Sequence, residues 1–199
     1  MLRRRAERGE DGNRGESILV VGLGNPGGEH AGTRHNLGFE VAQELSRRWG
    51  LPRARRRFGG LIAEGRAGPA GPRVAVLLPQ TYMNESGGSA GPARGALKLA
   101  PERVVVVHDE IDLPFGQVQA RLGGGLAGHN GLKSLVRGFG SPEFWRIRVG
   151  VGRPSSTEPE VVSSYVLSRF REPREEVAAL IERAAGEAEQ LVGELGSGS

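Results

Sequence analysis

Residues 18–27 read ILVVGLGNPG, an apolar run that ends in a turn containing glycine, asparagine and proline. A short run rich in Ile and Val and bounded by such residues is typical of a buried β-strand. After the turn come the polar residues 33–36 (TRHN), and then Leu37, Val41 and Leu45 recur at the spacing of a helix. Strand, polar turn and helix in this order predict an α/β fold, whose ligands usually bind where strands end.

Further strands and helices alternate along the chain. Apolar runs predict strands at residues 61–63, 74–78 and 104–107, and further strands are expected at 117–122, a short edge strand, and at 144–151. Helices are predicted at 86–99, 129–139 and 173–195. Residues 53–57 (RARRR) are expected to be a basic loop, and residues 161–170 are ambiguous between strand and helix. The alternation predicts an α/β fold: a twisted, mixed and largely parallel sheet covered by helices on both faces.

Length and composition suit one globular domain. The chain has 199 residues, of which 37% are hydrophobic and 25% charged. We expect the domain at residues 18–195, a disordered polar and basic tail at 1–17, and a flexible tail at 196–199. Residues 1–17 lack the apolar core of a signal peptide, and no apolar run in the chain approaches the length of a membrane span.

The chain has no cysteine, which excludes disulfides, thiol nucleophiles and thiolate metal sites and suits a reducing cytoplasm. Its net charge is +4, and Lys98 and Lys133 are the only lysines among 27 basic residues, which leaves 25 arginines. The arginines could reflect a coding bias. They could equally serve a phosphate-bearing partner, because guanidinium groups form paired hydrogen bonds with phosphate oxygens.

Two literal motif matches are not expected to be functional. Gly22, Gly24 and Gly27 have the spacing of a dinucleotide-binding motif, but helical periodicity begins only near Asn36, so no helix receives a pyrophosphate. Residues 87–91 have the spelling of a serine-hydrolase elbow, but no strand leads directly into Ser89.

Polar residues at strand ends form a candidate site. Each of five residues follows a predicted strand or leads into a helix, so one crevice could collect them: Asn25, His35, Asn84, Asp109 and Asn130. A histidine held by an aspartate can take a proton from water, and asparagine amides can stabilise an oxyanion. This set predicts hydrolysis of an activated carbonyl, such as a phosphate-bearing ester, without a metal or a covalent enzyme intermediate.

Other roles stay open for the same residues. His35 could hydrogen-bond its own backbone at a helix start, and Asp109 and Asp112 could be turn formers. The asparagines could cap helices or occupy left-handed turns. A metal site could be built from His108, Asp109, Asp112 and His129, although their spacing matches no recognised ligand pattern.

Five separated motifs closely resemble bacterial peptidyl-tRNA hydrolases. They are residues 24–27 (GNPG), 33–38 (TRHNLG), 82–84 (YMN), 108–114 (HDEIDLP) and 123–133 (GGGLAGHNGLK). The resemblance extends from about residue 18 to residue 195. It implies a cytoplasmic, usually monomeric enzyme without a cofactor. Such an enzyme binds the acceptor stem and 3′ end of peptidyl-tRNA and cleaves the ester between the peptide and the terminal ribose.

The resemblance also implies a role for particular residues. His35 would activate water, Asp109 would keep His35 basic, and Asn25 would recognise the first peptide bond. The other implied substrate-binding residues are His30, Tyr82, Met83, Asn84 and Asn130, with Arg121 and Arg148 clamping the tRNA 5′-phosphate and Lys133 on the neighbouring helix. His30 departs from the family, which usually has Tyr or Phe there, so an aromatic contact is in doubt.

Two other functions are compatible with parts of the pattern. A relative of this fold serves chloroplast intron splicing without hydrolase activity, so a non-catalytic RNA-binding protein is the main alternative. Such a protein would not need His35 and Asp109 together. A metal-dependent phosphoesterase is the second alternative, and it would lose activity in a chelator.

Overall fold

The computed structural model describes residues 17–198, and seven strands in this range form one sheet in the order β2-β3-β4-β1-β5-β7-β6. The strands are β1 (Ile18–Gly22), β2 (Arg55–Arg57), β3 (Gly60–Arg66), β4 (Arg73–Pro79), β5 (Val104–Glu110), β6 (Val118–Leu122) and β7 (Trp145–Gly150). β1 pairs in parallel with β4 and β5, and β5 with β7, whereas the pairings at both edges are antiparallel. The predicted mixed sheet is confirmed, and its parallel part is at the centre, with three parallel and three antiparallel pairings among the described strands.

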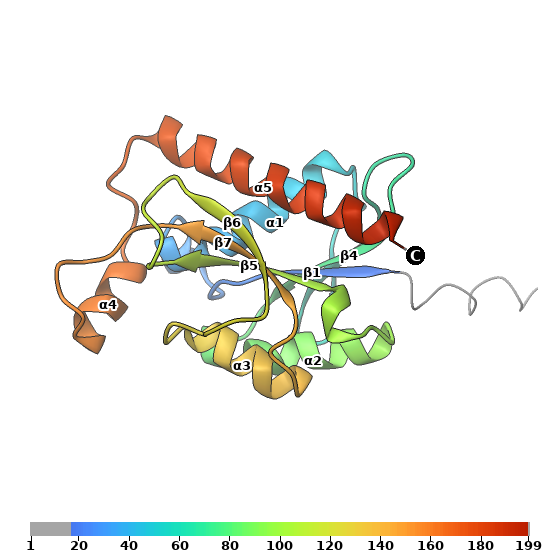
Figure 1. Cartoon of the computed structure of the whole chain (residues 1–199), viewed down its shortest axis with the longest axis horizontal. Coiled ribbons are helices and arrows are strands. Elements are labelled where there is room, and N and C mark those ends of the chain that lie inside the picture. The colour runs from blue at the N-terminus through green and yellow to red at the C-terminus, as the bar shows by residue number, and fades with distance from the viewer. Residues whose placement is uncertain (1–16, 199) are drawn as a thin grey trace, which may run out of the picture.

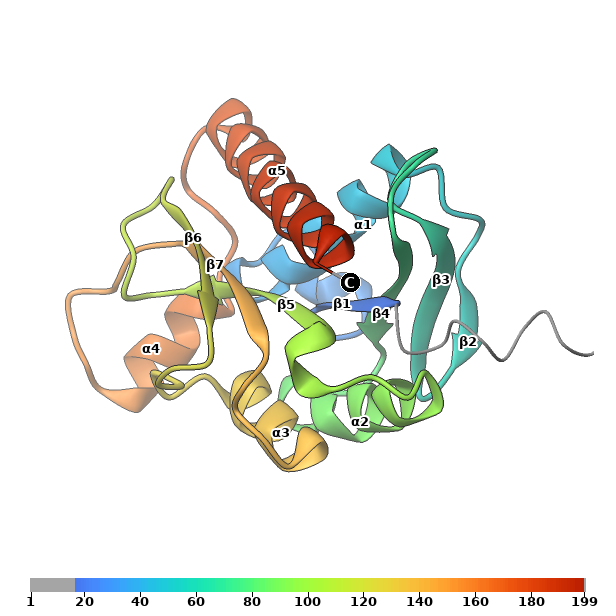
Figure 2. The ribbon, with the colours of Figure 1, turned by 45° about the vertical axis from the view of Figure 1, so that its right-hand side comes forward.

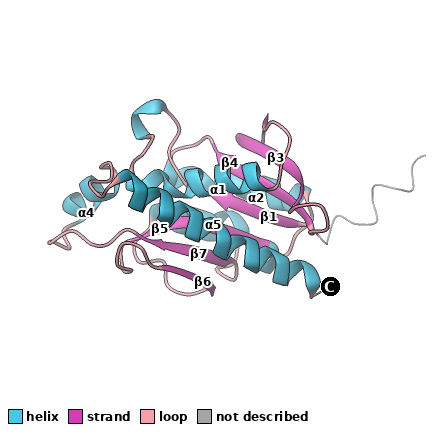
Figure 3. Ribbon diagram, turned by 90° about the horizontal axis from the view of Figure 1, so that it is seen from above, coloured by secondary structure: helices cyan, strands magenta, loops and turns pink. Residues whose placement is uncertain are grey.

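Helices cover both faces of the sheet, as predicted (Figures 1 and 2). The α-helices are α1 (Leu37–Arg48), α2 (Ser86–Ala96), α3 (Asn130–Phe139), α4 (Pro159–Val166) and α5 (Arg174–Ser197). α1 and α5 lie across one face, seen from above in Figure 3, and α2 and α3 lie on the other. α4 stands beyond the end of the sheet, where the parallel strands finish (Figure 1).

β1 and the first four residues of β5 are apolar because both faces of these central strands are covered, and β5 becomes polar only at its carboxyl end, residues 108–110. All five residues of β1 and all seven of β5 are buried. Alternate side chains enter different cores: Val20 packs with Val41 and Leu180 under α1 and α5, whereas Val21 packs with Leu132 on the side of α2 and α3. The sheet therefore presents the carboxyl ends of β1, β4, β5 and β7 at one edge.

Glycines in α2 and α3 allow these two helices to touch. A Cβ atom at Gly87 would lie 2.0 Å from the carbonyl oxygen of Ser134, and one at Gly138 would lie 2.5 Å from the carbonyl oxygen of Gly87. The glycines that lower the helix propensity of α2 therefore fit its close packing against α3.

Residues 53–57 were predicted to be a loop, and this is wrong for Arg55–Arg57, which form β2. β2 pairs with β3 through a two-residue turn in which Phe58 and Gly59 have φ values of 56° and 67°. Its side chains are all exposed at the sheet edge, so no apolar alternation marks it as a strand.

The ends of the chain also differ from expectation. α5 continues to Ser197, although a tail was predicted from residue 196. Residues 1–16 of the predicted N-terminal tail lie outside the described range. The ambiguous segment 161–170 begins within α4 and ends in irregular structure. Within residues 17–198 no helix combines the length and apolar character needed to cross a membrane.

Candidate active site

A cleft of about 740 Å³ lies at the carboxyl ends of the central strands. It collects most of the predicted site residues: Asn25, His35, Tyr82, Met83, Asn84, Asp109, Asn130 and Lys133, together with His129. On the opposite side, α4 and the residue after it contribute the apolar side chains of Val162, Val166 and Leu167. The predicted convergence at one edge of the sheet is therefore present.

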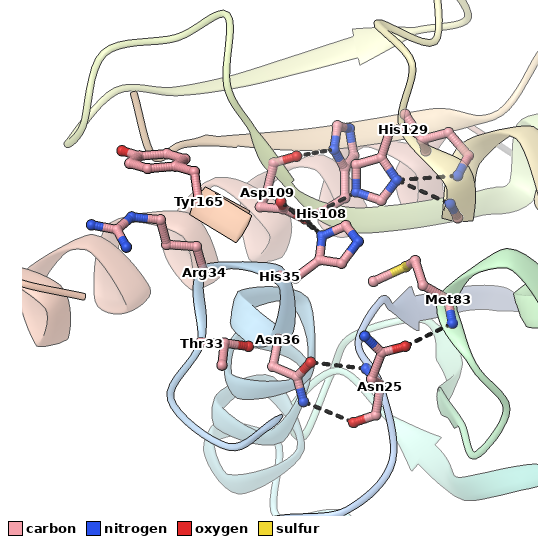
Figure 4. Close-up of polar contacts among 12 residues, drawn as sticks. Asn25, Thr33, Arg34, His35, Asn36, Met83, His108, Asp109, His129 and Tyr165 are labelled. Atoms are coloured by element: carbon pink, nitrogen blue, oxygen red, sulfur yellow. Dashed lines mark hydrogen bonds and ion pairs between the residues drawn. The ribbon is translucent and has the colours of Figure 1, made fainter. Parts of the chain in front are cut away.

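His35 and Asp109 are in direct contact at the base of the cleft. The Nδ1 atom of His35 lies 2.9 Å and 3.0 Å from the two carboxylate oxygens of Asp109, which is only 2% exposed. An ionised carboxylate can only accept, so Nδ1 carries the ring proton and donates it. The Nε2 atom then holds a lone pair and points away from Asp109 (Figure 4).

The turn that carries His35 is held by its neighbour Asn36. The Oδ1 atom of Asn36 accepts the N–H of Asn25 at 2.8 Å, and its Nδ2 group donates to the carbonyl of Asn25 at 2.9 Å. A Cβ atom at Gly38 would lie 2.4 Å from the carbonyl oxygen of Val107, so glycine lets α1 start directly against β5. These contacts bring the His35 turn beside the end of β5.

The pair has shifted pKa values. Burial opposes protonation of His35, but the charge and hydrogen bond of Asp109 together outweigh it, and the pKa of His35 is raised above 6.5. Burial likewise opposes ionisation of Asp109, but its attraction to His35 and His129 and its hydrogen bonds with them lower its pKa below 3.8. Asp109 is therefore a carboxylate at neutral pH, and His35 is a stronger base than a free imidazole.

Asn25 presents an amide donor to the cleft. Its Oδ1 atom accepts the backbone N–H of Met83 at 2.8 Å, which fixes the orientation of the side chain (Figure 4). Its Nδ2 group donates to no residue within 17–198 and is free to bind a carbonyl in the cleft that Asn25 lines. Asn84 and Asn130 are exposed at the rim of the same cleft.

His129 is a functional candidate that sequence reasoning missed, having treated it only as a helix start or a metal ligand. Its Nδ1 atom accepts the N–H groups of Gly131 and Leu132 at 3.1 Å and 3.4 Å and so caps α3. Its Nε2 atom must then carry the ring proton, which it donates to Asp109 at 2.9 Å. Its position just before the predicted helix indicated the cap, but the contact with Asp109 depends on the fold.

The alternative metal site does not form as proposed. His108 is buried, its Nδ1–H donates to the carbonyl of Asp109 at 2.8 Å, and Asp112 accepts from Arg153 at 2.8 Å. The described residues grouped closely enough to hold an ion are instead His35, Asp109 and His129, whose ligand atoms lie within 4.8 Å of one another. Both imidazoles present N–H groups to the carboxylate, so a cation would have to displace these protons.

Three predicted residues lie outside the cleft. His30 is in the 3₁₀ turn η2 (Gly28–His30), with its Nε2 atom 3.9 Å from the carboxylate of Glu29. Arg121 and Arg148 lie on the adjacent strands β6 and β7. Arg148 donates to Glu110 and Gln119, both at 3.0 Å. The two arginines of the predicted clamp therefore lie on neighbouring strands, and Arg148 contacts Glu110, which lines the cleft.

Ser89 is not a nucleophile in this arrangement. It is completely buried in α2 and does not line the cleft. The glycine motif likewise lacks an α-helix at its third glycine, because only the short 3₁₀ turn η2 follows Gly27 and α1 begins at Leu37. Both dismissals of literal motifs are consistent with the structure.

Comparisons with known proteins agree on one family. A family profile described as peptidyl-tRNA hydrolase matches residues 19–197. The chain is 48% identical over 179 residues to a peptidyl-tRNA hydrolase of Mycobacterium sp. (strain KMS), covering 89% of this chain and 91% of the relative. It is 51% identical over 152 residues to the enzyme of Syntrophotalea carbinolica, covering 76% and 78%.

A solved structure gives the same result. The crystal structure of peptidyl-tRNA hydrolase from Acinetobacter baumannii superposes with a TM-score of 0.80 at 39% identity, covering 92% of this chain and 90% of that one. The sequence matches, the shared fold and the residues of the cleft all indicate the same family. The chain belongs to the peptidyl-tRNA hydrolase family.

Proposed function

We propose that this protein hydrolyses the ester that joins a peptide to the terminal ribose of tRNA, with His35 as the general base. One observation carries the proposal: Nδ1 of His35 is bound to the buried carboxylate of Asp109, while Nε2 points away from it in a cleft that also contains the free amide of Asn25. A water molecule at Nε2 would be activated as in other histidine–aspartate hydrolases.

The reaction needs only one base. Nε2 of His35 takes a proton from water as the water oxygen bonds to the ester carbonyl carbon. Asp109 stabilises the imidazolium that forms, and amide donors in the cleft stabilise the oxyanion. The tetrahedral intermediate then breaks its bond to the ribose oxygen, which receives the proton from His35. The products are a ribose hydroxyl and a peptide carboxylic acid, which releases the second proton of the water to solvent and becomes a carboxylate.

Asn25 would select peptidyl over aminoacyl esters. Its Nδ2 group can donate to the carbonyl of the first peptide bond, a group that a free aminoacyl ester lacks. Leaving a buried donor unpaired is costly, so the absence of this carbonyl gives strong discrimination. Asn84, Asn130, Tyr82 and Met83 complete the substrate surface on the same side of the cleft.

Arg121, Arg148 and Lys133 would bind phosphates of the tRNA, with the two arginines on the 5′-phosphate and Lys133 in the cleft. Phosphate contacts set the position of the nucleic acid without reading its bases. The resemblance to the family implies that the protein acts as a monomer. The proposed reaction needs no cofactor, and a substrate produced by translation supports a cytoplasmic location.

The test is release of N-blocked aminoacyl-tRNA by the purified protein in a chelator, with the unblocked ester and a His35→Ala variant in parallel. Cleavage of only the blocked ester, abolished in the variant, is the expected result. Binding of tRNA without cleavage of either ester would refute the proposal and favour an RNA-binding role. Cleavage that disappears in the chelator would point to a metal.

A further inference from the structure

Arg146 is a buried arginine that the reaction above does not use. It lies on β7, is only 2% exposed, and its Nε atom has no hydrogen-bond partner among residues 17–198. In the register of the sheet it stands opposite Arg121 and two residues before Arg148, so all three side chains emerge on one face. A buried cation beside Arg121 and Arg148, the proposed phosphate-binding pair, calls for a structural explanation.

The guanidinium of Arg146 holds the glycine loop, which we define as residues 123–128. It donates to the carbonyl of Gly125 at 2.7 Å and to that of Gly124 at 3.0 Å. Arg121 packs on the same loop, because a Cβ atom at Gly124 would lie 2.7 Å from the Nε atom of Arg121. Gly124 also has a φ of 96°, which favours glycine. The loop therefore contacts both Arg121 and Arg146.

The glycine loop leads directly into the active site. The backbone N–H of His129 donates to the carbonyl of Leu126 at 2.8 Å. His129 then caps α3 and binds Asp109, and Asn130 follows at the rim of the cleft. A displacement of the loop would move both residues relative to His35.

We propose that Arg146 is a positioning residue that couples phosphate binding at Arg121 and Arg148 to the placement of His129 and Asn130 through the glycine loop. The proposal rests on the proposed function. Burial, and then the neighbouring charges of Arg121 and Arg148, lower the pKa of Arg146 below its ordinary value. A phosphate at these two arginines offsets the repulsion and strengthens the hold of Arg146 on the loop. By thermodynamic linkage, a glycine loop that is held in place must in turn strengthen the binding of the phosphate.

The first test compares N-blocked aminoacyl-tRNA with and without its 5′-phosphate. In the wild-type protein we expect removal of the phosphate to raise KM and to lower kcat by about tenfold, the equivalent of one charge-assisted hydrogen bond. In Arg146→Lys, which keeps the charge but not the fork that binds two carbonyls, kcat should be low for both substrates and their kcat ratio should be close to one. The KM difference should remain, because Arg121 and Arg148 are intact.

The matched control is Arg73→Gln, which removes an exposed arginine at the start of β4, at the opposite end of the sheet. It should keep the wild-type kcat ratio. If Arg146→Lys lowers kcat by the same factor for both substrates, Arg146 is merely structural and the coupling is wrong. A wild-type kcat that does not respond to the phosphate would also overturn it.

A second measurement uses the wild-type protein and does not depend on catalysis or on the folding of a variant. Amide hydrogen exchange is followed at Gly131 and Leu132, whose N–H groups bind His129, with an acceptor-stem RNA hairpin added. A 5′-phosphorylated hairpin at saturation should slow their exchange several-fold more than a saturating 5′-hydroxyl hairpin. Equal protection by the two would overturn the coupling, whereas failure to cleave either ester would refute only the proposed function.

Discussion

His35, in the turn before α1, and His129, at the start of α3, both bind the carboxylate of Asp109. They do so through different ring nitrogens. Their side chains are similarly exposed, at 11% and 9%, and their ring centroids are 5.0 Å apart. His35 uses Nδ1 for Asp109 and leaves Nε2 free, whereas His129 uses Nε2 for Asp109 and Nδ1 for the helix cap. Hydrogen-bond partners, and not exposure, therefore distinguish the proposed general base from a histidine that caps a helix and binds the same carboxylate.

The comparison predicts the largest loss of activity for His35→Ala. Removing a general base typically costs 10²–10⁴-fold. We expect kcat to fall by about 10³–10⁴-fold because, within residues 17–198, the other histidine that lines the cleft, His129, has both ring nitrogens bonded. Single-turnover cleavage of N-blocked aminoacyl-tRNA measures the effect, with circular dichroism to confirm folding. A loss smaller than tenfold would show that another group activates water.

Asp109→Asn should have the next largest effect, a loss of about 10²–10³-fold in kcat. The amide offers one acceptor oxygen where two imidazole N–H groups now bind, so one histidine must lose its bond or change its tautomer. Activity requires unprotonated His35, so it rises with pH through a pKa above 6.5. Loss of the carboxylate charge lowers that pKa, so the acid limb of the kcat/KM profile should shift to lower pH. An unchanged limb would contradict the assigned pair.

Two substitutions of His129 should affect kcat and the free energy of unfolding differently. His129→Ala removes the helix cap and one hydrogen bond to Asp109, so we expect a loss of about 1 kcal/mol in the free energy of unfolding and about tenfold in kcat. His129→Asn keeps a side-chain acceptor for the cap and should recover most of the stability without recovering kcat. Urea unfolding and initial rates measure the two effects. A kcat as low as that of His35→Ala would show that the two histidines are not distinct in role.

The sequence predicted the parts of this arrangement that depend on local pattern. The valine run at 104–107 indicated a central strand. The polar residues that follow this strand and the first strand correctly predicted that Asp109 and His35 lie at the same edge of the sheet. The role of His129 was missed because its bond to Asp109 spans 20 residues and depends on the path of the glycine loop. Strand β2 was missed for a similar reason, since its arginines are exposed and only pairing with β3 defines it.

The smallest effect is expected for His108, the third histidine beside Asp109. Its Nδ1–H binds the backbone carbonyl of Asp109 and not the carboxylate, and its Nε2 atom is buried without a partner among the described residues. Burial, and then its closeness to His129, lower the pKa of His108 to about 3, so it does not titrate where His35 does.

We therefore expect His108→Asn to change kcat by roughly threefold or less and to leave the acid limb of the pH profile in place, while the loss of a buried hydrogen bond costs about 1 kcal/mol of stability. Stability and pH profiles measured on the same preparation would test this. A shift of the acid limb would mean that His108 acts on the carboxylate through the backbone, and that contact with the Asp109 side chain is not what distinguishes these histidines.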